Sequence, residues 1–230
     1  MKKVIWIFWA QGWDSAPPVA RASRSSWETL NPDWEVRALD GDSPEYSKVK
    51  EFCQNKNLGW AAKSDLLRLD LLKENGGVWV DATTICLQPL DEWLENQMGK
   101  ERFFLFKKDK SVSSWFLASD PSTTLISEWH ERSFRFLENR KRPDVYLWLH
   151  RIFNNILKEG FGAELNFLSA STKKKEGPHF LCPTRVTSKR PPGKYFYARL
   201  LKENPPLLKL AKHPFVKGSQ FELFIKPHLK

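Results

Sequence analysis

This sequence is poor in cysteine and contains no long apolar run. Its three cysteines, Cys53, Cys86 and Cys182, are unclustered and odd in number. They indicate neither a disulfide framework nor a zinc knuckle, and they fit a reducing compartment. The apolar run after Lys2 and Lys3 covers only about seven residues, too few to span a bilayer, and no small-residue cleavage site follows it. We therefore expect a cytoplasmic protein without a signal peptide or a spanning helix.

Glycine is also modest, at 11 residues, and there is no low-complexity tract. In contrast, 11 tryptophans and 16 phenylalanines provide large apolar side chains for a chain of 230 residues. This composition is typical of a globular protein, and the length suits one α/β domain better than two. We expect a single domain over residues 1–230.

Charge is distributed unevenly along the chain. Residues 1–100 carry 12 Lys and Arg against 15 Asp and Glu, whereas residues 101–230 carry 25 against 12. A basic half could attract a diphosphate, an acidic glycan or an anionic membrane surface, so peripheral membrane association is one expectation. No helix-turn-helix, zinc-finger or RNP-like pattern accompanies it, so nucleic acid is not an expected partner.

Hydrophobic patterning predicts alternating strands and helices. Such alternation favours a parallel sheet with right-handed crossovers. The expected strands are 4–8, 34–39, 78–80, 102–106 and 113–118, and the expected helices are 19–30, 60–75, 122–139 and 144–157.

The third expected strand leads directly to a carboxylate, Asp81. Ligands of open α/β sheets bind at the carboxyl ends of strands, although a turn or helix cap would also explain a lone aspartate there. In the preceding helix, Asp65 and Arg68 are three residues apart and can point from one face. A surface ion pair is the alternative interpretation of these two residues.

The segments Ser64-Asp65-Leu66-Leu67-Arg68 and Gly76-Gly77-Val78-Trp79-Val80-Asp81-Ala82-Thr83 together resemble the SDxxR…GGxYxDxD signature of DXD-motif glycosyltransferases with a GT-A fold. The resemblance is to the capsular polysaccharide synthesis and mannosyltransferase-like group, closely over residues 60–91 and loosely over 1–100. It implies a Rossmann-like α/β domain with a mainly parallel central sheet flanked by helices. Residues 1–100 would bind a nucleotide sugar and residues 101–230 an acceptor.

The same resemblance implies a divalent cation, Mn²⁺ or Mg²⁺. A cation held by oxygen ligands would stabilise the departing diphosphate as a Lewis acid. The ligands implied here are Asp81, Thr83 and, in a weakly matching C-terminal segment, His213. Because Thr83 replaces the second aspartate of the motif, one ligand is a hydroxyl instead of a carboxylate.

Further residues are implied to bind the donor, most simply a UDP-sugar. Phe8 ends the first expected strand, and Trp9 and Gln11 follow it. Trp9 best matches the aromatic residue that stacks on the base, with a core position as the alternative. Asp65 and Arg68 would hold sugar hydroxyls, and Asp81 would contact ribose, metal and phosphate. Lys189 would lie in a basic segment over the diphosphate, or else in a surface loop.

Two downstream residues are candidates for catalysis on the acceptor side. An inverting enzyme needs a group that takes the acceptor proton, and Asp144 and His150 are the candidates, whereas a retaining enzyme needs no such base. Asp144 could instead be a helix N-cap, and His150 a core residue of an aromatic-rich helix.

The resemblance therefore implies a hexosyl- or pentosyltransferase that acts in polysaccharide biosynthesis. The alternative from another class is a non-catalytic glycan- or nucleotide-binding protein that retains the fold.

Overall fold

The computed structural model describes residues 1–109, 111–171, 173–181, 189–210 and 216–229. Within them the strands are β1 (Val4–Phe8), β2 (Glu35–Leu39), β3 (Gly77–Asp81), β4 (Thr84–Cys86), β5 (Phe103–Lys108), β6 (Ser111–Ser119), β7 (Phe167–Ser169) and β8 (Leu207–Lys209). Six of these strands form the central sheet in the order β2-β1-β3-β6-β5-β7. Three of its five pairings are parallel, and β6 runs antiparallel to both of its neighbours. The predicted α/β fold with a mainly parallel sheet is confirmed.

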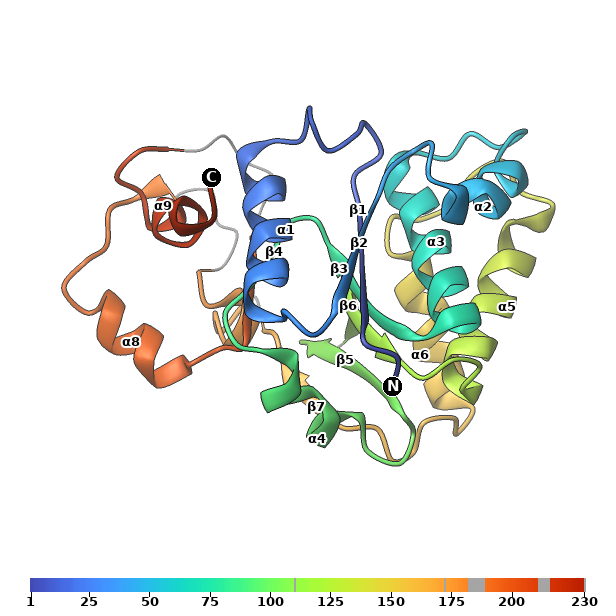
Figure 1. Ribbon diagram of the computed structural model, residues 1–230. Coiled ribbons are helices and arrows are strands. Elements are labelled where there is room, and N and C mark those ends of the chain that lie inside the picture. Colours follow the sequence, from blue (N-terminus) through green and yellow to red (C-terminus); the bar gives the residue numbers. More distant parts are fainter. Residues whose placement is uncertain (110, 172, 182–188, 211–215, 230) are drawn as a thin grey trace.

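Helices cover both faces of this sheet (Figure 1). The α-helices are α1 (Pro18–Leu30), α2 (Ser47–Phe52), α3 (Trp60–Asn75), α4 (Leu94–Met98), α5 (Thr124–Glu138), α6 (Trp148–Lys158), α8 (Phe196–Glu203) and α9 (Gln220–Ile225). Side chains of α3, α5 and α6 share one hydrophobic cluster, and those of α1 and α4 share another. The result is a three-layer sandwich with the sheet in the middle.

The strand β1 shows why the sequence forms these layers. Alternate side chains of a strand point to opposite faces. Trp6 therefore joins the cluster of α3 and α5, while Ile5 and Ile7 join the cluster of α1. All five β1 residues are buried, as expected for a strand covered on both faces, whose sequence is a continuous apolar run.

The predicted elements match the observed ones with one clear error in a boundary. The helix expected from residue 144 begins at Trp148. Residues 144–147 form a loop, and Leu147 holds the N-cap position, so Asp144 is not a helix cap. Both carboxylate oxygens of Asp144 instead accept hydrogen bonds from Arg151, at 2.8 Å.

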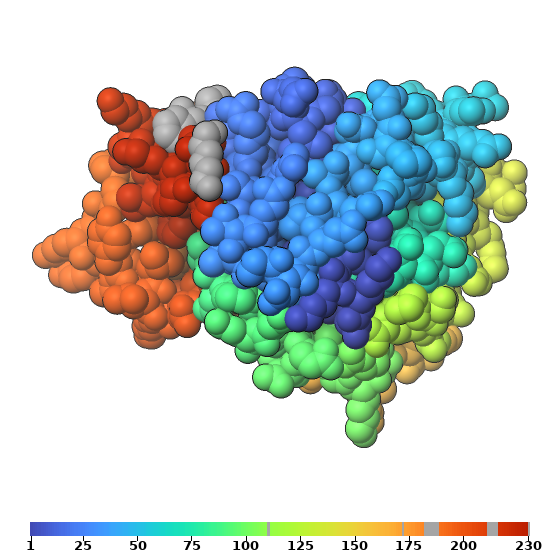
Figure 2. Space-filling model, in the orientation of Figure 1, coloured from blue at the N-terminus to red at the C-terminus, as the bar shows by residue number. Residues whose placement is uncertain are grey.

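The C-terminal region packs beside α1 and returns to the centre of the molecule. In Figure 2 it forms one end of the face shown, coloured orange and red. From this region β8 pairs antiparallel with β4, with Lys209 opposite Thr84. The part of the chain that the structure describes contains no helix long and apolar enough to cross a bilayer.

Candidate active site

A cavity of about 990 Å³ opens at the carboxyl ends of β1 and β3. These strands are parallel neighbours, and their last residues, Phe8 and Asp81, lie side by side. The cavity is bounded by the segments that follow these strands, the start of α3, β6, the loop before α6 and the end of β8. This is the edge at which open α/β sheets bind ligands.

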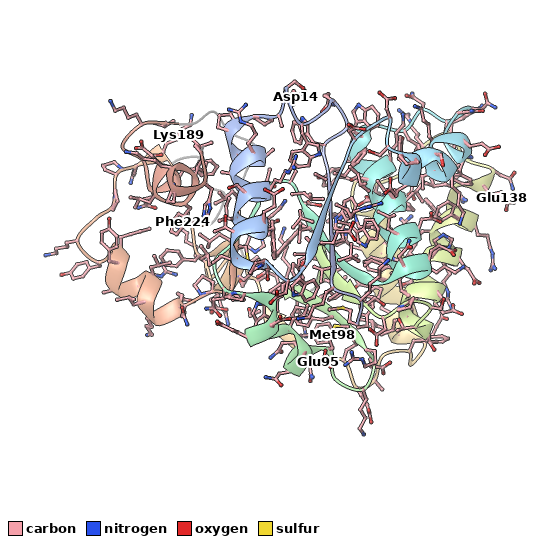
Figure 3. The ribbon with its side chains drawn as sticks, viewed as in Figure 1. Asp14, Glu95, Met98, Glu138, Lys189 and Phe224 are labelled. Atoms are coloured by element: carbon pink, nitrogen blue, oxygen red, sulfur yellow. The ribbon has the colours of Figure 1, made fainter. Side chains whose placement is uncertain are left out.

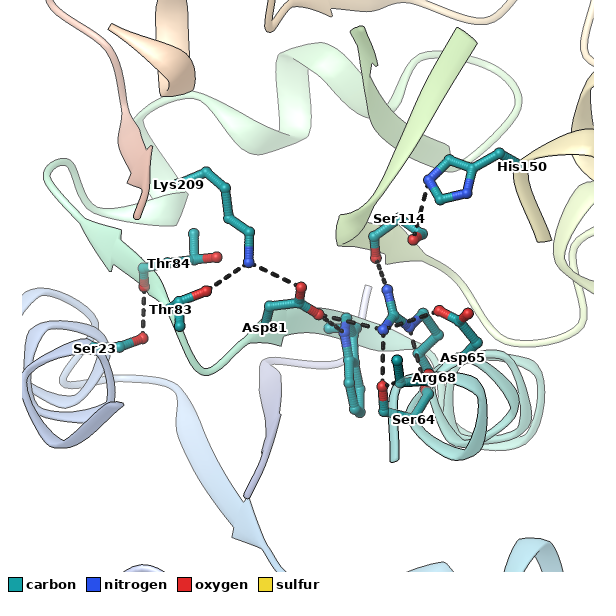
Figure 4. A network of polar contacts seen from close by, with 12 residues as sticks. Ser23, Ser64, Asp65, Arg68, Asp81, Thr83, Thr84, Ser114, His150 and Lys209 are labelled. Carbon is teal, nitrogen blue, oxygen red and sulfur yellow. Dashed lines mark hydrogen bonds and ion pairs between the residues drawn. The ribbon is translucent and has the colours of Figure 1, made fainter. Parts of the chain in front are cut away.

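Asp65, Arg68 and Asp81 meet in this cavity. The Arg68 Nη2 atom lies 3.2 Å from an Asp65 oxygen and 3.3 Å from Asp81 Oδ1. Only 5% of the Arg68 side chain is exposed. Its guanidinium lies 5.1 Å from the centre of the Trp79 ring and donates a hydrogen bond to the Ser114 carbonyl. The arginine is therefore held in one orientation from several sides (Figure 4).

The local sequence explains this meeting. Asp65 and Arg68 lie on one face of α3, which ends at Asn75 because Gly76 adopts a positive φ of 67°. Gly77 starts β3, and four residues later Asp81 ends it at the cavity. The short turn between helix and strand thus fixes the carboxylate opposite the arginine.

Lys209 completes the network, and sequence analysis missed it. Its Nζ atom lies 2.9 Å from Asp81 Oδ2 and 2.6 Å from Thr83 Oγ1. Figure 4 shows the lysine on the opposite side of Asp81 from Arg68. Nothing in the sequence links position 209 to position 81, because only the pairing of β8 with β4 brings them together.

Asp81 and Thr83, the two described ligands of the predicted metal site, do not fit a divalent cation in this arrangement. Mg²⁺ needs oxygen ligands at about 2.1 Å, and here a lysine ammonium lies between the two oxygens. The Asp81 oxygen that does not contact Lys209 faces Arg68. Among the described residues, no group of three or more His, Cys, Asp or Glu could hold a metal. His213 lies outside the described residues.

Aromatic side chains line the side of the cavity next to β1. Phe8 is 7% exposed, and its ring contacts those of Tyr46 and Trp60 at centroid distances of 5.4 and 6.2 Å. Trp9 is half-buried and packs against the core. Both Trp9 and the exposed Gln11 line the cavity. Trp60 is 44% exposed, and its place at the cavity was not anticipated.

The candidates on the acceptor side lie at the opposite wall. His150 Nε2 is 3.4 Å from Ser114 Oγ, and both residues line the cavity. Asp144 lies at the same wall, but its carboxylate is paired with Arg151. The neighbouring Tyr146 is 86% exposed and was not anticipated.

Lys189 does not line the cavity. It is exposed and lies in the C-terminal region (Figure 3). The structure therefore does not bring Lys189 together with Asp81 and Arg68, as the prediction of a diphosphate contact would require.

The electrostatics of the three acidic and basic groups follow from burial and from their neighbours. Burial raises the pKa of Asp65 to about 6, although Arg68 opposes this shift. Burial also acts to raise the pKa of Asp81, but the charges of Lys209 and Arg68 outweigh it and lower the pKa below the usual range. Burial, followed by the charges of Arg68 and Lys108, lowers the pKa of His150 to about 4. The imidazole of His150 is therefore neutral at neutral pH.

A buried histidine behind the cavity gives a testable pH dependence of stability. Burial lowers the pKa of His179, whose ring contacts Trp115, from 6.5 to about 4. Below pH 6.5 the unfolded chain binds a proton that the folded protein does not, so stability is lost as pH falls from 6.5 to 4. We expect His179→Gln to reduce this loss by about 3 kcal/mol, measured by urea unfolding at both pH values. The control is His228→Gln, since His228 has only a smaller downward shift. Equal pH dependence in His179→Gln and the unmodified protein would contradict the expectation.

Comparison with known proteins identifies the family. A family model described as capsular polysaccharide synthesis protein matches residues 1–189. The chain belongs to this family. Its membership agrees with the resemblance expected from the segments around Asp65 and Asp81.

Two curated relatives of this family member are sugar-transferring enzymes. The chain is 27% identical over 150 residues to the initiation-specific alpha-1,6-mannosyltransferase of Candida albicans, covering 59% of this chain and 37% of that protein. It is 29% identical over 157 residues to the glycosyltransferase afumC of Aspergillus fumigatus, covering 55% and 38%. The matches thus span well under half the length of these relatives.

Solved structures of glycosyltransferases share the fold. The apo form of GlyE from Streptococcus pneumoniae superposes with a TM-score of 0.57 at 13% identity, covering 100% of this chain and 61% of that one. The PaToxG glycosyltransferase gives 0.53 at 14% identity, covering 70% and 69%. At these identities the likeness concerns the fold, which is a GT-A-like α/β domain.

Proposed function

We propose that this protein transfers a sugar from a nucleoside-diphosphate-sugar donor to a glycan acceptor. The observation that carries the proposal is the cluster of Asp65, Arg68, Asp81 and Lys209 in one cavity at the carboxyl ends of β1 and β3. Membership of the capsular polysaccharide synthesis family, with sugar-transferring relatives, supports the same reaction class.

The charge of the cavity suits a diphosphate. Among the described residues, four cationic side chains line it, against three carboxylates. The cations are Arg68, Lys108, Arg142 and Lys209, and the carboxylates are Asp65, Asp81 and Asp144. A surplus of positive charge in a partly enclosed cavity attracts an anionic ligand and stabilises negative charge that develops during reaction.

The donor would lie along the wall formed by β1 and α3. Trp9 and Trp60 offer rings to a nucleotide base, with the buried Phe8 packed against Trp60, and Gln11 offers an amide for hydrogen bonding. Asp65 and Arg68 would hold hydroxyls of the sugar, since a fixed carboxylate and guanidinium provide acceptors and donors at set positions. A UDP-sugar is the donor that we propose to test first.

The acceptor would enter from the wall formed by β6 and the loop before α6. Exposed Tyr146 provides a ring at the cavity mouth, while Ser114 and His150 provide polar groups deeper inside. If the reaction inverts the anomeric carbon, neutral His150 can accept the acceptor proton, although its pKa of about 4 makes it a weak base unless the bound substrates raise that pKa. Asp144 is less suited to that role, because both of its carboxylate oxygens are already engaged by Arg151.

Donor binding can be tested by thermal shift with a panel of UDP-, GDP- and dTDP-sugars. A ligand at 100 times its Kd stabilises the folded state by about 2.7 kcal/mol, which corresponds to about 5–10 °C in Tm for a chain of this size. We expect one nucleotide class to give such a shift, and the free sugars and the nucleoside monophosphate, as controls, to give less. Absence of any shift across the panel would overturn the proposed function.

Turnover separates the enzyme from a non-catalytic binding protein. The latter is favoured only by Thr83, which stands in place of the second acidic residue of the motif. We propose the enzyme, because the cavity also contains a neutral histidine next to a serine on its acceptor wall. Release of the nucleoside diphosphate from the donor identified by thermal shift supports the enzyme, and binding without release supports the alternative.

A further inference from the structure

Lys209 lies where a cation would be expected between Asp81 and Thr83. The backbone determines this position: Lys209 is opposite Thr84 in the β4–β8 pair, and the next residue, Leu210, donates from its backbone N to the Thr83 carbonyl at 2.8 Å. The adjacent Leu208 is fully buried. The lysine is thus anchored on both sides, and its ammonium is already ordered next to the two oxygens.

Both oxygens of the Asp81 carboxylate already contact N–H groups of other described residues. Oδ2 contacts Lys209, while Oδ1 lies 3.2 Å from the Trp79 indole nitrogen and 3.3 Å from Arg68. A divalent ion at this carboxylate would have to displace an ammonium, or remain a few ångströms from it at a considerable electrostatic cost. Thr83, the second candidate ligand, contributes a neutral hydroxyl.

We propose that the Lys209 ammonium takes the place of the divalent cation, so that this protein binds its nucleotide-sugar donor without metal. The inference rests on the proposed function and specifies how its site compensates the diphosphate charge. An ammonium has three N–H donors. Two of them meet Asp81 and Thr83, which leaves one for a diphosphate oxygen. The lysine side chain lines the cavity and is 19% exposed, so a ligand can reach it.

The chemistry balances without a metal. In the transfer step the bond between the anomeric carbon and the phosphate oxygen breaks, and its electron pair stays on that oxygen. A new bond forms between the anomeric carbon and the acceptor oxygen, which loses its proton to a base. The departing diphosphate gains one negative charge. Lys209 keeps its proton and stabilises this charge through a charge-assisted hydrogen bond.

Calorimetry tests the proposal. It measures the binding of UDP, GDP and dTDP to the full chain, once in EDTA and once in Mn²⁺. We expect the nucleotide that binds to have the same Kd in both conditions, within about twofold. Lys209→Met should weaken its binding about tenfold or more, because a charge-assisted hydrogen bond is lost. Lys209→Arg should retain part of the affinity, and Mn²⁺ should not restore binding to Lys209→Met.

Lys73→Met is the matched control. Lys73 is 24% exposed, forms an ion pair with Glu131 and does not line the cavity. Its substitution should leave the Kd unchanged. Circular dichroism and urea unfolding verify that each variant folds. If Lys209→Met is unfolded, the Kd of Lys209→Arg and the comparison of the Kd in EDTA with that in Mn²⁺ still decide the outcome.

The possible failures are distinguishable. Nucleotide binding that requires Mn²⁺, or that is unaffected in Lys209→Met, overturns the role of Lys209 but leaves the proposed function standing. No binding of any of the three nucleotides, in either condition, overturns both.

Discussion

Asp81→Asn is expected to lower donor turnover by about 100-fold or more. The substitution would let Arg68 and Lys209 shift, and a displacement of about 1 Å in an active site can lower the rate by that order. The Asp81 carboxylate lies between Arg68 and Lys209 and contacts both. Without its charge, the two cations repel each other across the site and lose their common anchor. Asparagine keeps the shape and can still accept the hydrogen bond from Trp79, so the effect should come from charge. The measurement is kcat/KM from release of the nucleoside diphosphate.

A second aspartate provides a matched control for this experiment. Asp120 directly follows β6, pairs with Arg102 at 2.8 Å and has a side chain 27% exposed, against 29% for Asp81. It lies outside the cavity lining. Asp120→Asn should therefore leave kcat/KM unchanged even if stability falls. If Asp81→Asn turns over donor at the rate of the unmodified protein, Asp81 does not belong to the site.

Gly77→Ala is expected to destabilise the protein by about 3–5 kcal/mol, a large share of the total stability of a domain. Gly77 has a φ of 97°, and a Cβ at this position would lie 2.5 Å from Val4 Cγ1 and 2.6 Å from the Val4 carbonyl oxygen. An added methyl group would therefore strain the backbone and push β1 and β3 apart. The same turn presents the Gly76 carbonyl to the buried Trp6 indole, at 3.0 Å.

Urea unfolding followed by far-ultraviolet circular dichroism measures this effect. Gly193→Ala is the control, since among the described residues no atom beyond the glycine and its two chain neighbours lies within 4 Å of a Cβ added there. Its change should stay within about 0.5 kcal/mol, as for most surface substitutions. A Gly77→Ala protein with the same midpoint and slope as the unmodified protein would show that the turn accommodates a side chain.

The elements were largely predictable because hydrophobic periodicity and glycine stops are local signals. The apolar positions of residues 60–75 and the following glycines predicted α3 and β3, and both are present. The start of α6 was not predictable in the same way. Asp144 looks like a helix cap in sequence, but its carboxylate pairs with Arg151, the fourth residue of α6. This contact depends on the fold of the loop that precedes the helix.

The site residues also differ in how far the sequence predicted them. Asp65, Arg68 and Asp81 lie within one helix-turn-strand unit, and the resemblance of this unit to the glycosyltransferase signature implied a common site. The arrangement of Arg68 between the two carboxylates agrees with that expectation, and their roles toward a donor stay predictions. Lys189 was predicted from its charge and from the place of its segment in the resemblance, and it is not among the residues that line the cavity.

The sequence by itself determined the order of strands and helices, the glycine turn that leads to Asp81, and the proximity of Asp81 to Arg68. These features depend on interactions between residues close together in the chain. The tertiary structure alone decided that Lys209 lies between Asp81 and Thr83, because that contact spans 128 residues and depends on the pairing of two three-residue strands. Strands so short carry little periodicity in sequence, so their register emerges only when the surrounding core has packed.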